Sequence, residues 1–121
     1  MPHSIKPRIR IVDEEGTIVM GPGKADLLEA IRRSGSIRAA AEELDMSYMR
    51  AWTLVKTMNA AFRSPLVEKE RGGAAQGGAQ LTERGHKVLE LYRVMEEKAR
   101  RAITREWGRL RRELTSGGER R

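Results

Sequence analysis

The sequence contains no cysteine, which excludes disulfide bonds and metal sites built on thiolates. Aromatic residues make up only 4% of the chain, so a hydrophobic core has to be built mainly from Leu, Ile, Val, Met and Ala. No stretch approaches the roughly 20 apolar residues that cross a bilayer, so no membrane partner is expected. Residues 1–4 do not begin a long apolar run, as a signal peptide would, and a cytoplasmic location is therefore expected.

Charge, in contrast, is abundant and unbalanced. The 121 residues include 24 Lys and Arg against 17 Asp and Glu, a formal net charge of +7. Such a surplus favours a polyanionic partner, because each Lys or Arg near a phosphate releases a condensed counterion. The length suits a single domain, 1–121, and a chain this small and poor in aromatics would gain buried apolar surface by dimerisation.

The first half of the chain predicts a β-hairpin followed by three helices. In the hairpin, residues 5–20, polar and apolar residues alternate from Arg8 to Ile11, and residues 13–16 supply the turn. The segment 23–62 has apolar residues at helical spacing. Ser34-Gly35 is expected to end the first helix, and Ser36 and Ser47 are natural N-caps for the second and third.

The second half predicts another hairpin and a long helix. Residues 66–81 contain two strand-like segments around a glycine-rich stretch, and Thr82 would cap a final helix that runs to about residue 114. Together the segments predict a mainly α fold with a small β content. The predicted architecture is a winged helix-turn-helix with an N-terminal hairpin and a long C-terminal dimerisation helix.

The second and third helices have the pattern of a helix-turn-helix. Two short helices, 36–44 and 47–61, are joined by the short turn Asp45-Met46, and the small residues Ala39–Ala41 allow the helices to pack closely. The third helix carries an arginine and hydroxyl groups that can reach base edges and phosphates in a major groove. The candidate residues for binding double-stranded DNA are Ser36, Arg38, Ser47, Tyr48, Met49, Arg50, Thr53 and Lys56, with Lys69, Arg71 and Gln76 on the wing.

Each of these residues also has an ordinary structural interpretation. Ser36 and Ser47 can be caps alone, and Arg50 and Lys56 can belong to a solvated helix face. The constellation as a whole, followed by a glycine-tipped hairpin, favours DNA binding. An architectural protein that coats or bends DNA with little sequence preference is the alternative.

The last helix carries an apolar stripe that a single small domain cannot cover over its whole length. Packing against the N-terminal hairpin accounts for its first two turns only, so a partner helix is expected. A twofold homodimer would place two reading helices about 34 Å apart, on successive major grooves. The candidate dimerisation residues are Val88, Tyr92, Met95, Ala99, Ile103, Trp107 and Leu110.

An enzyme is not expected. His3 and His86 are the only histidines, they are far apart in the sequence, and no grouping of a nucleophile with a base is recognisable. The prediction is therefore a binding protein without a catalytic residue, metal or cofactor.

Several segments of the sequence match those of a known family. Gly35–Ala41, Met46–Trp52, Leu66-Val67, Gly77–Ala79 and Leu81-Thr82 resemble the N-terminal domain of molybdate-responsive (ModE-type) transcription regulators, over roughly residues 27–100. The helix-turn-helix is also similar, more distantly, to that of LysR-type regulators. The resemblance implies a dimeric winged-helix repressor or activator. It also implies that Ser47, Tyr48 and Arg50 face the groove, while Trp52 packs or contacts the DNA backbone.

Two departures from the family pattern qualify what the resemblance implies. Family members often carry a basic residue where Met49 stands, which implies a different base preference. Family members also continue into a molybdate-binding module, and this chain ends before such a module begins. Sensing of molybdate or another oxyanion is therefore not expected from these residues. Regulation from elsewhere, a small ligand in the dimer and constitutive action remain open.

Overall fold

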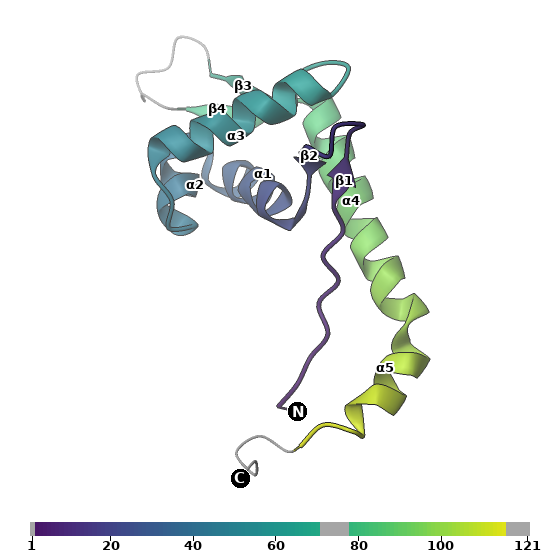
Figure 1. The fold of residues 1–121 in the computed structure, drawn as a ribbon. Coiled ribbons are helices and arrows are strands. Elements are labelled where there is room, and N and C mark those ends of the chain that lie inside the picture. The colour runs from purple at the N-terminus through teal and green to yellow at the C-terminus, as the bar shows by residue number, and fades with distance from the viewer. Residues whose placement is uncertain (1, 71–77, 116–121) are drawn as a thin grey trace.

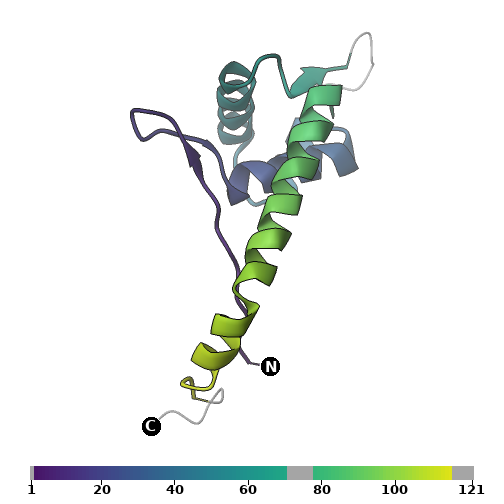
Figure 2. The ribbon, with the colours of Figure 1, turned by 90° about the vertical axis from the view of Figure 1, so that its right-hand side faces the viewer.

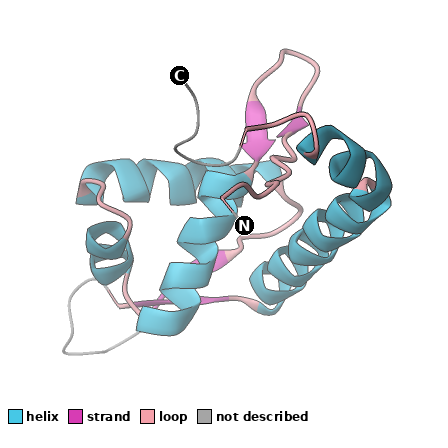
Figure 3. Cartoon of the chain, turned by 90° about the horizontal axis from the view of Figure 1, so that it is seen from below, coloured by secondary structure: helices cyan, strands magenta, loops and turns pink. Residues whose placement is uncertain are grey.

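The computed structural model describes residues 2–70 and 78–115. Helices dominate, and the strands form two separate antiparallel pairs, β1–β2 and β3–β4, seen in magenta in Figure 3. The elements in chain order are β1 (Ile11–Val12), β2 (Ile18–Met20), α1 (Pro22–Ser34), α2 (Ile37–Glu43), α3 (Tyr48–Ala61), β3 (Val67–Lys69), β4 (Ala79–Leu81), α4 (Glu83–Ala102) and α5 (Thr104–Arg111) (Figure 1). The predicted class, mainly α with a small β content and a winged helix-turn-helix arrangement, is confirmed.

Helix α1 forms the centre of the molecule and contacts α2, α3 and α4. Its Leu27, Leu28 and Ile31 are completely buried, and they meet apolar side chains from the surrounding helices such as Val55 and Leu89. Burying a Leu or Ile side chain stabilises a fold by about 1.5–3 kcal/mol. The core therefore fixes the positions of α3 and α4 on two different sides of α1.

The helix-turn-helix is built by three local signals that the sequence contains. The hydroxyls of Ser36 and Ser47 accept hydrogen bonds from Ala39 N and Arg50 N, both at 3.0 Å, and so cap α2 and α3. Between them, Asp45 adopts a left-handed conformation with φ 60°. Met46 N then donates to Ala41 O at 2.9 Å and Asp45 N to Glu42 O at 3.1 Å, which is a Schellman ending for α2.

The N-terminal hairpin is shorter than predicted. Its two strands cover only Ile11–Val12 and Ile18–Met20 with an irregular register, whereas residues 2–10 have no regular secondary structure. The predicted turn is present, because the Asp13 carboxylate accepts hydrogen bonds from Glu15 N and Thr17 N and Gly16 has φ 86°. The first helix also begins earlier, at Pro22, because proline is well suited to the first helical position, where no amide hydrogen is needed.

The predicted single helix over 82–114 is wrong: the chain forms α4 and α5, separated at Ile103. Ile103 leaves helical geometry with φ −107° and ψ 13°. The adjacent Ile103 and Thr104 are both β-branched and lower helix propensity, and the Thr104 hydroxyl donates to Arg100 O at 3.3 Å. Hydroxyls that bond to a carbonyl four residues earlier often bend helices, and this bond lies at the break.

The apolar residues of α4 lie on two faces, and this corrects one predicted dimer contact. Tyr92 is only 2% exposed, belongs to the chain's own core and donates a hydrogen bond to Ile9 O at 2.6 Å, so it is not a dimerisation residue. Val88 also packs against this core. The second face, which we call the α4 stripe, consists of Leu91, Val94 and Met95, which are 55%, 48% and 43% exposed. Figure 2 shows α4 running past the other helices toward α5.

Candidate nucleic-acid interface

Helix α3 presents a polar and apolar ridge to the surface. Ala51, Val55 and Met58 bury its inner side. On the outer side Met49, Thr53 and Lys56 follow one another at helical spacing and are exposed, with Met49 exposed to 69%. Arg50 is exposed beside this ridge. The structure therefore brings four of the predicted binding residues together on one open helix face.

The start of α3 lies against α2 through the side chains of two other predicted residues. The Arg38 guanidinium lies 4.4 Å from the centre of the Tyr48 ring, a cation–π contact worth about 0.5–1 kcal/mol at an exposed site. Ser36 and Ser47, also predicted to bind DNA, use their hydroxyls as caps. A capping oxygen still has a lone pair, but its orientation is fixed by the cap.

The predicted wing is an antiparallel pair attached to the helix-turn-helix. Val67 pairs with Leu81 and Lys69 with Ala79, and Ala79 N donates to Gly35 O at 3.0 Å, just before α2. Asn59 of α3 also holds the wing, because its amide bonds the backbone of Leu66 and Val67 at 2.8–3.1 Å. The wing is thus fixed to both ends of the helix-turn-helix.

Of the three wing residues predicted to bind DNA, one can be located. The Lys69 ammonium lies 4.8 Å from the centre of the Trp52 ring, so this cation is held beside α3. Arg71 and Gln76 lie outside the described residues. Trp52 is half-buried and packs against the core, in agreement with the packing role considered for it.

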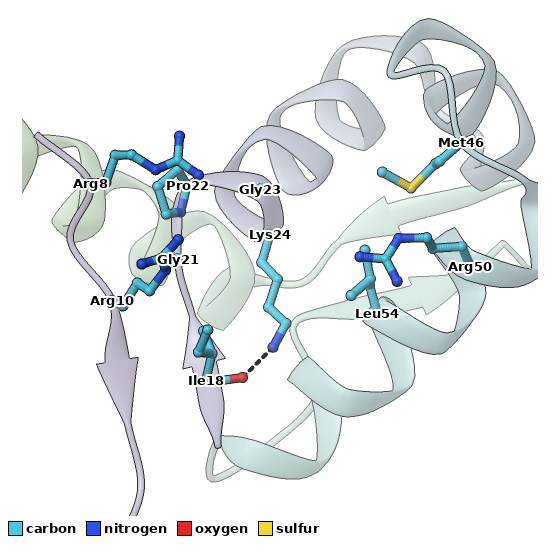
Figure 4. Close-up of a pocket in the computed structure, with 10 residues that line it drawn as sticks. All are labelled: Arg8, Arg10, Ile18, Gly21, Pro22, Gly23, Lys24, Met46, Arg50 and Leu54. Carbon is cyan, nitrogen blue, oxygen red and sulfur yellow. Dashed lines mark hydrogen bonds between the residues drawn. The ribbon is translucent and has the colours of Figure 1, made fainter. Parts of the chain in front are cut away.

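A cavity on the other side of α3 was missed by the sequence analysis. It has a volume of about 350 Å³. It lies between three parts of the chain: the N-terminal segment before β1 (residues 2–10), the start of α1, and α3. We call it the hairpin-side pocket. Its cations are Arg8, Arg10, Lys24 and Arg50 (Figure 4). The alternation of Arg8 and Arg10 with isoleucines indicated only a strand, and nothing in the sequence placed Lys24 beside them.

Lys24 is the most enclosed cation of the hairpin-side pocket. Its ammonium donates a hydrogen bond to Ile18 O, drawn as a dashed line in Figure 4, and burial lowers its pKa. Figure 4 also shows the Lys24 and Arg50 side chains extending from α1 and α3 into the space between these helices. No carboxylate lines this pocket among the described residues.

Ion pairs are concentrated away from α3. Each salt bridge within the described residues uses one of five arginines from α1 and α4, namely Arg32, Arg33, Arg93, Arg100 and Arg101. The cations of α3, of the wing and of the hairpin-side pocket take part in none of these bridges. None of these cations therefore forms an ion pair with a described carboxylate.

The described residues contain no group of three or more His, Asp or Glu side chains that could hold a metal ion. They also include no helix long and apolar enough to cross a membrane.

Comparison with known proteins places this geometry in a family. The family model described as bacterial regulatory helix-turn-helix protein, lysR family, matches residues 24–86, from the first turn of α1 to the start of α4. The chain is also similar to two solved structures. It matches the structure titled CbnR_DBD-DNA complex with a TM-score of 0.58 and 25% identity, over 73% of this chain and 95% of that one. It matches full-length CbnR complexed with the target DNA with a TM-score of 0.55 and 26% identity, over 69% and 27%.

Three relatives show a second similarity. The chain is 43% identical over 91 residues to the molybdenum transport protein ModE of Azotobacter vinelandii, covering 75% of this chain and 33% of that protein. It is 46% identical over 77 residues to the molybdenum-pterin-binding protein MopB of Rhodobacter capsulatus, covering 64% and 28%. It is 36% identical over 82 residues to the DNA-binding transcriptional dual regulator ModE of Escherichia coli K12, covering 68% and 31%. The chain thus spans about a third of the length of these relatives. Since the family model matches more than half of its residues, the chain belongs to the lysR family of bacterial regulatory helix-turn-helix proteins.

Proposed function

We propose that this chain is a transcription regulator that binds duplex DNA with α3 in the major groove and the β3–β4 wing on the adjacent backbone. The observation that carries the proposal is the exposed ridge of Met49, Thr53 and Lys56, with Arg50 beside it and with no ion pair to Arg50 or Lys56 among the described residues. A helix of about 10–12 Å diameter fits a major groove of about 12 Å. The proposal gives the chain a binding role and no catalytic one.

The resemblance to regulators supports the assignment of roles. Arg50 would form a bidentate contact with a guanine, which is the commonest specific contact in major grooves. Thr53 and Lys56, further along the ridge, would contact a base edge and a phosphate. Arg38 on α2 and Lys69 on the wing, each held against an aromatic ring of α3, would contact the DNA backbone on that side.

Fluorescence anisotropy tests this function. Binding to a duplex from the region upstream of the protein's own gene is compared with binding to a scrambled duplex, over a range of salt concentrations. A specific regulator is expected to prefer the first duplex by about 10³-fold or more. Equal binding with a steep salt dependence would indicate the architectural alternative, and no binding to either duplex would refute both.

Substitution of Arg50 tests the role of α3. Arg50→Ala is expected to weaken specific binding by about 1–3 kcal/mol and to relax the preference at one base pair. Arg105→Ala removes the same charge from α5, far from α3 in Figure 1, and is expected to leave this preference unchanged. Equal weakening of all duplexes by Arg50→Ala would make Arg50 a phosphate contact. Unchanged binding would mean that α3 is not the reading helix.

We also propose that the chain acts as a homodimer through the α4 stripe. Leu91, Val94 and Met95 are large apolar side chains on one exposed face, continued along the chain by Ile103 and Leu110, which are exposed as well. Ala99 and Trp107, which were also predicted as contacts, are half-buried along the same two helices. A second copy of α4 is the partner expected for such a stripe, because antiparallel or parallel helix pairs bury apolar residues at this spacing.

Sedimentation velocity tests the dimer. The double variant Leu91→Glu/Met95→Glu is expected to sediment as a monomer, because four buried charges at a twofold interface would be unpaired. His86→Glu adds a charge to a different, exposed face of α4 and is expected to remain dimeric. A dimer that persists in the double variant would place the interface elsewhere.

A further inference from the structure

The two flanks of α3 face different parts of the fold, and a Lys or Arg side chain lies beside each of them. Trp52 and Asn59 lie on one side of the exposed ridge, where they contact Lys69 and the backbone of β3. Arg50 and Leu54, one helical turn apart, lie on the other side, where they line the hairpin-side pocket. The ridge of Met49, Thr53 and Lys56 runs between these flanks.

A helix that enters a major groove has phosphates on both sides. The groove is about 12 Å wide and a helix with its side chains is about 10–12 Å across, so each flank of the helix faces the backbone of one strand. With α3 in the groove, the wing faces one strand. The hairpin-side pocket then faces the other strand, beyond Arg50.

We propose that the hairpin-side pocket holds a phosphodiester group of the DNA strand opposite the wing, an inference that rests on the proposed function. Arg8, Arg10 and Lys24 contact the phosphate oxygens, and Arg50 lies between this contact and the bases. The N-terminal segment before β1 thereby becomes part of the DNA interface, together with the helix-turn-helix and the wing.

Charge is the main argument for an anionic ligand. Four cations line one cavity, no carboxylate lines it, and none of the four is in a salt bridge with a described residue. Elsewhere in the described chain, arginines of α1 and α4 are neutralised by Asp and Glu. Four cations in one pocket repel one another, and the negative charge of a phosphodiester beside them would reduce that repulsion.

Lys24 shows that this positive charge is partly desolvated. It is half-buried, it donates to Ile18 O, and burial lowers the pKa of its ammonium. An anion beside a desolvated cation is bound more strongly than one in open solvent, because the local dielectric constant is lower. The start of α1 adds a smaller contribution, since its first turn has neither a side-chain cap nor an acidic residue.

The test uses the full chain and the double variant Arg10→Gln/Lys24→Gln. Glutamine removes each charge, and at position 24 its amide can still donate toward Ile18 O, so folding is expected to be preserved. Circular dichroism of the variant checks that its helical content is that of the wild type. The charge-conserving variant Arg10→Lys/Lys24→Arg and the α5 variant Arg105→Ala serve as controls. Binding to the specific and the scrambled duplex is measured by anisotropy from about 50 to 200 mM salt.

The glutamine variant is expected to bind both duplexes about tenfold more weakly than the wild type, with the preference between them unchanged. The slope of log K against log salt concentration is expected to become shallower by about one unit for each protomer bound. Both controls are expected to retain the wild-type slope. A glutamine variant with the wild-type affinity and slope would overturn the inference, while wild-type binding to the specific duplex would still support the proposed function.

A titration with inorganic phosphate distinguishes DNA from a free anion as the source of the phosphate group. The backbone amide signals of Gly23 and Lys24 are followed by nuclear magnetic resonance, first with inorganic phosphate and then with the duplex. In the wild type, both signals are expected to shift when the duplex is added. In the glutamine variant, the same amide signals are expected to stay unchanged on addition of the duplex. Saturation by inorganic phosphate combined with no response to the duplex would overturn the assignment to a phosphodiester.

Discussion

The contact between Gly85 and Leu66 gives the sharpest test of the packing. Gly85 is buried in the first turn of α4, and a Cβ atom added there would lie 2.1 Å from the carbonyl oxygen of Leu66 and 3.0 Å from its carbonyl carbon. Leu66 is fully buried, and its carbonyl accepts a hydrogen bond from Thr82 N at 2.9 Å. The oxygen cannot move aside without losing this bond, so α4 and the wing would have to separate.

Gly85→Ala is therefore expected to destabilise the fold by about 3 kcal/mol, at the upper end of the usual cost of overpacking. Helix propensity alone predicts the opposite sign, because alanine is better than glycine inside a helix by about 0.5–1 kcal/mol. The matched control is Gly108→Ala in α5, where nothing lies within 4 Å of the added Cβ. Only the difference in helix propensity between glycine and alanine affects stability at this position, so Gly108→Ala is expected to be as stable as the wild type or slightly more stable.

Urea unfolding followed by circular dichroism measures both free energies, at one protomer concentration because a dimer's stability depends on it. In a thermal scan, a loss of 3 kcal/mol corresponds to a fall in Tm of roughly 10 °C for a chain of this size. If Gly85→Ala stays within about 0.5 kcal/mol of the wild type, α4 does not approach Leu66 as closely as described. The packing argument would then be wrong.

Substitutions at three other positions test polar interactions in the same unfolding assay. Asn59→Ala removes three hydrogen bonds to the start of the wing and is expected to cost about 2 kcal/mol, whereas Asn59→Asp keeps the acceptor and should cost less. Tyr92→Phe removes the bond to Ile9 O and should cost about 1 kcal/mol, with no change in the sedimenting mass. The pKa of Glu29 is lowered, mainly by its hydrogen bond to Arg32, so its contribution to stability is present above its ordinary pKa of 4.5 and is lost as the pH falls. Glu29→Gln should therefore make the unfolding free energy depend less on pH below about 4.5, and an unchanged dependence would refute this role.

The elements that the sequence predicted well are those set by local interactions. Ser36, Ser47 and Thr82 were identified as N-caps, and each hydroxyl accepts a hydrogen bond from the amide three residues later. Gly35 was identified as the end of the first helix and has φ 75°. A cap depends on residues within one turn, so a short stretch of sequence is enough to predict it.

Features that depend on distant segments were missed or misassigned. Apolar spacing along α4 could not tell which face meets the chain's own core, and Tyr92 was assigned to a partner although it bonds to Ile9. The break at Ile103 depends on weak propensities that a continuous apolar pattern concealed. The hairpin-side pocket joins Arg8, Lys24 and Arg50 from three segments, and no periodicity in one segment predicts such a meeting.

The position of α1 separates the two surfaces on which the proposed function depends. Helix α1 contacts both α3 and α4, and the ridge of α3 and the α4 stripe are the exposed faces of these two helices, turned away from the core. A partner helix on the stripe therefore leaves Arg50 uncovered. Helix α4 carries six Lys and Arg against four Glu, and ion pairs such as Arg93 with Asp26 offset part of this charge. Most of the net charge of +7 lies in residues 83–121, which carry 12 Lys and Arg against seven Glu, but two other segments are basic as well. Helix α3 carries Arg50 and Lys56 without a carboxylate, and residues 2–10 carry Lys6, Arg8 and Arg10 without one. Positive charge on these two segments would attract a polyanion toward the face that carries the proposed reading residues, and the attraction falls with salt over a Debye length of about 8–10 Å.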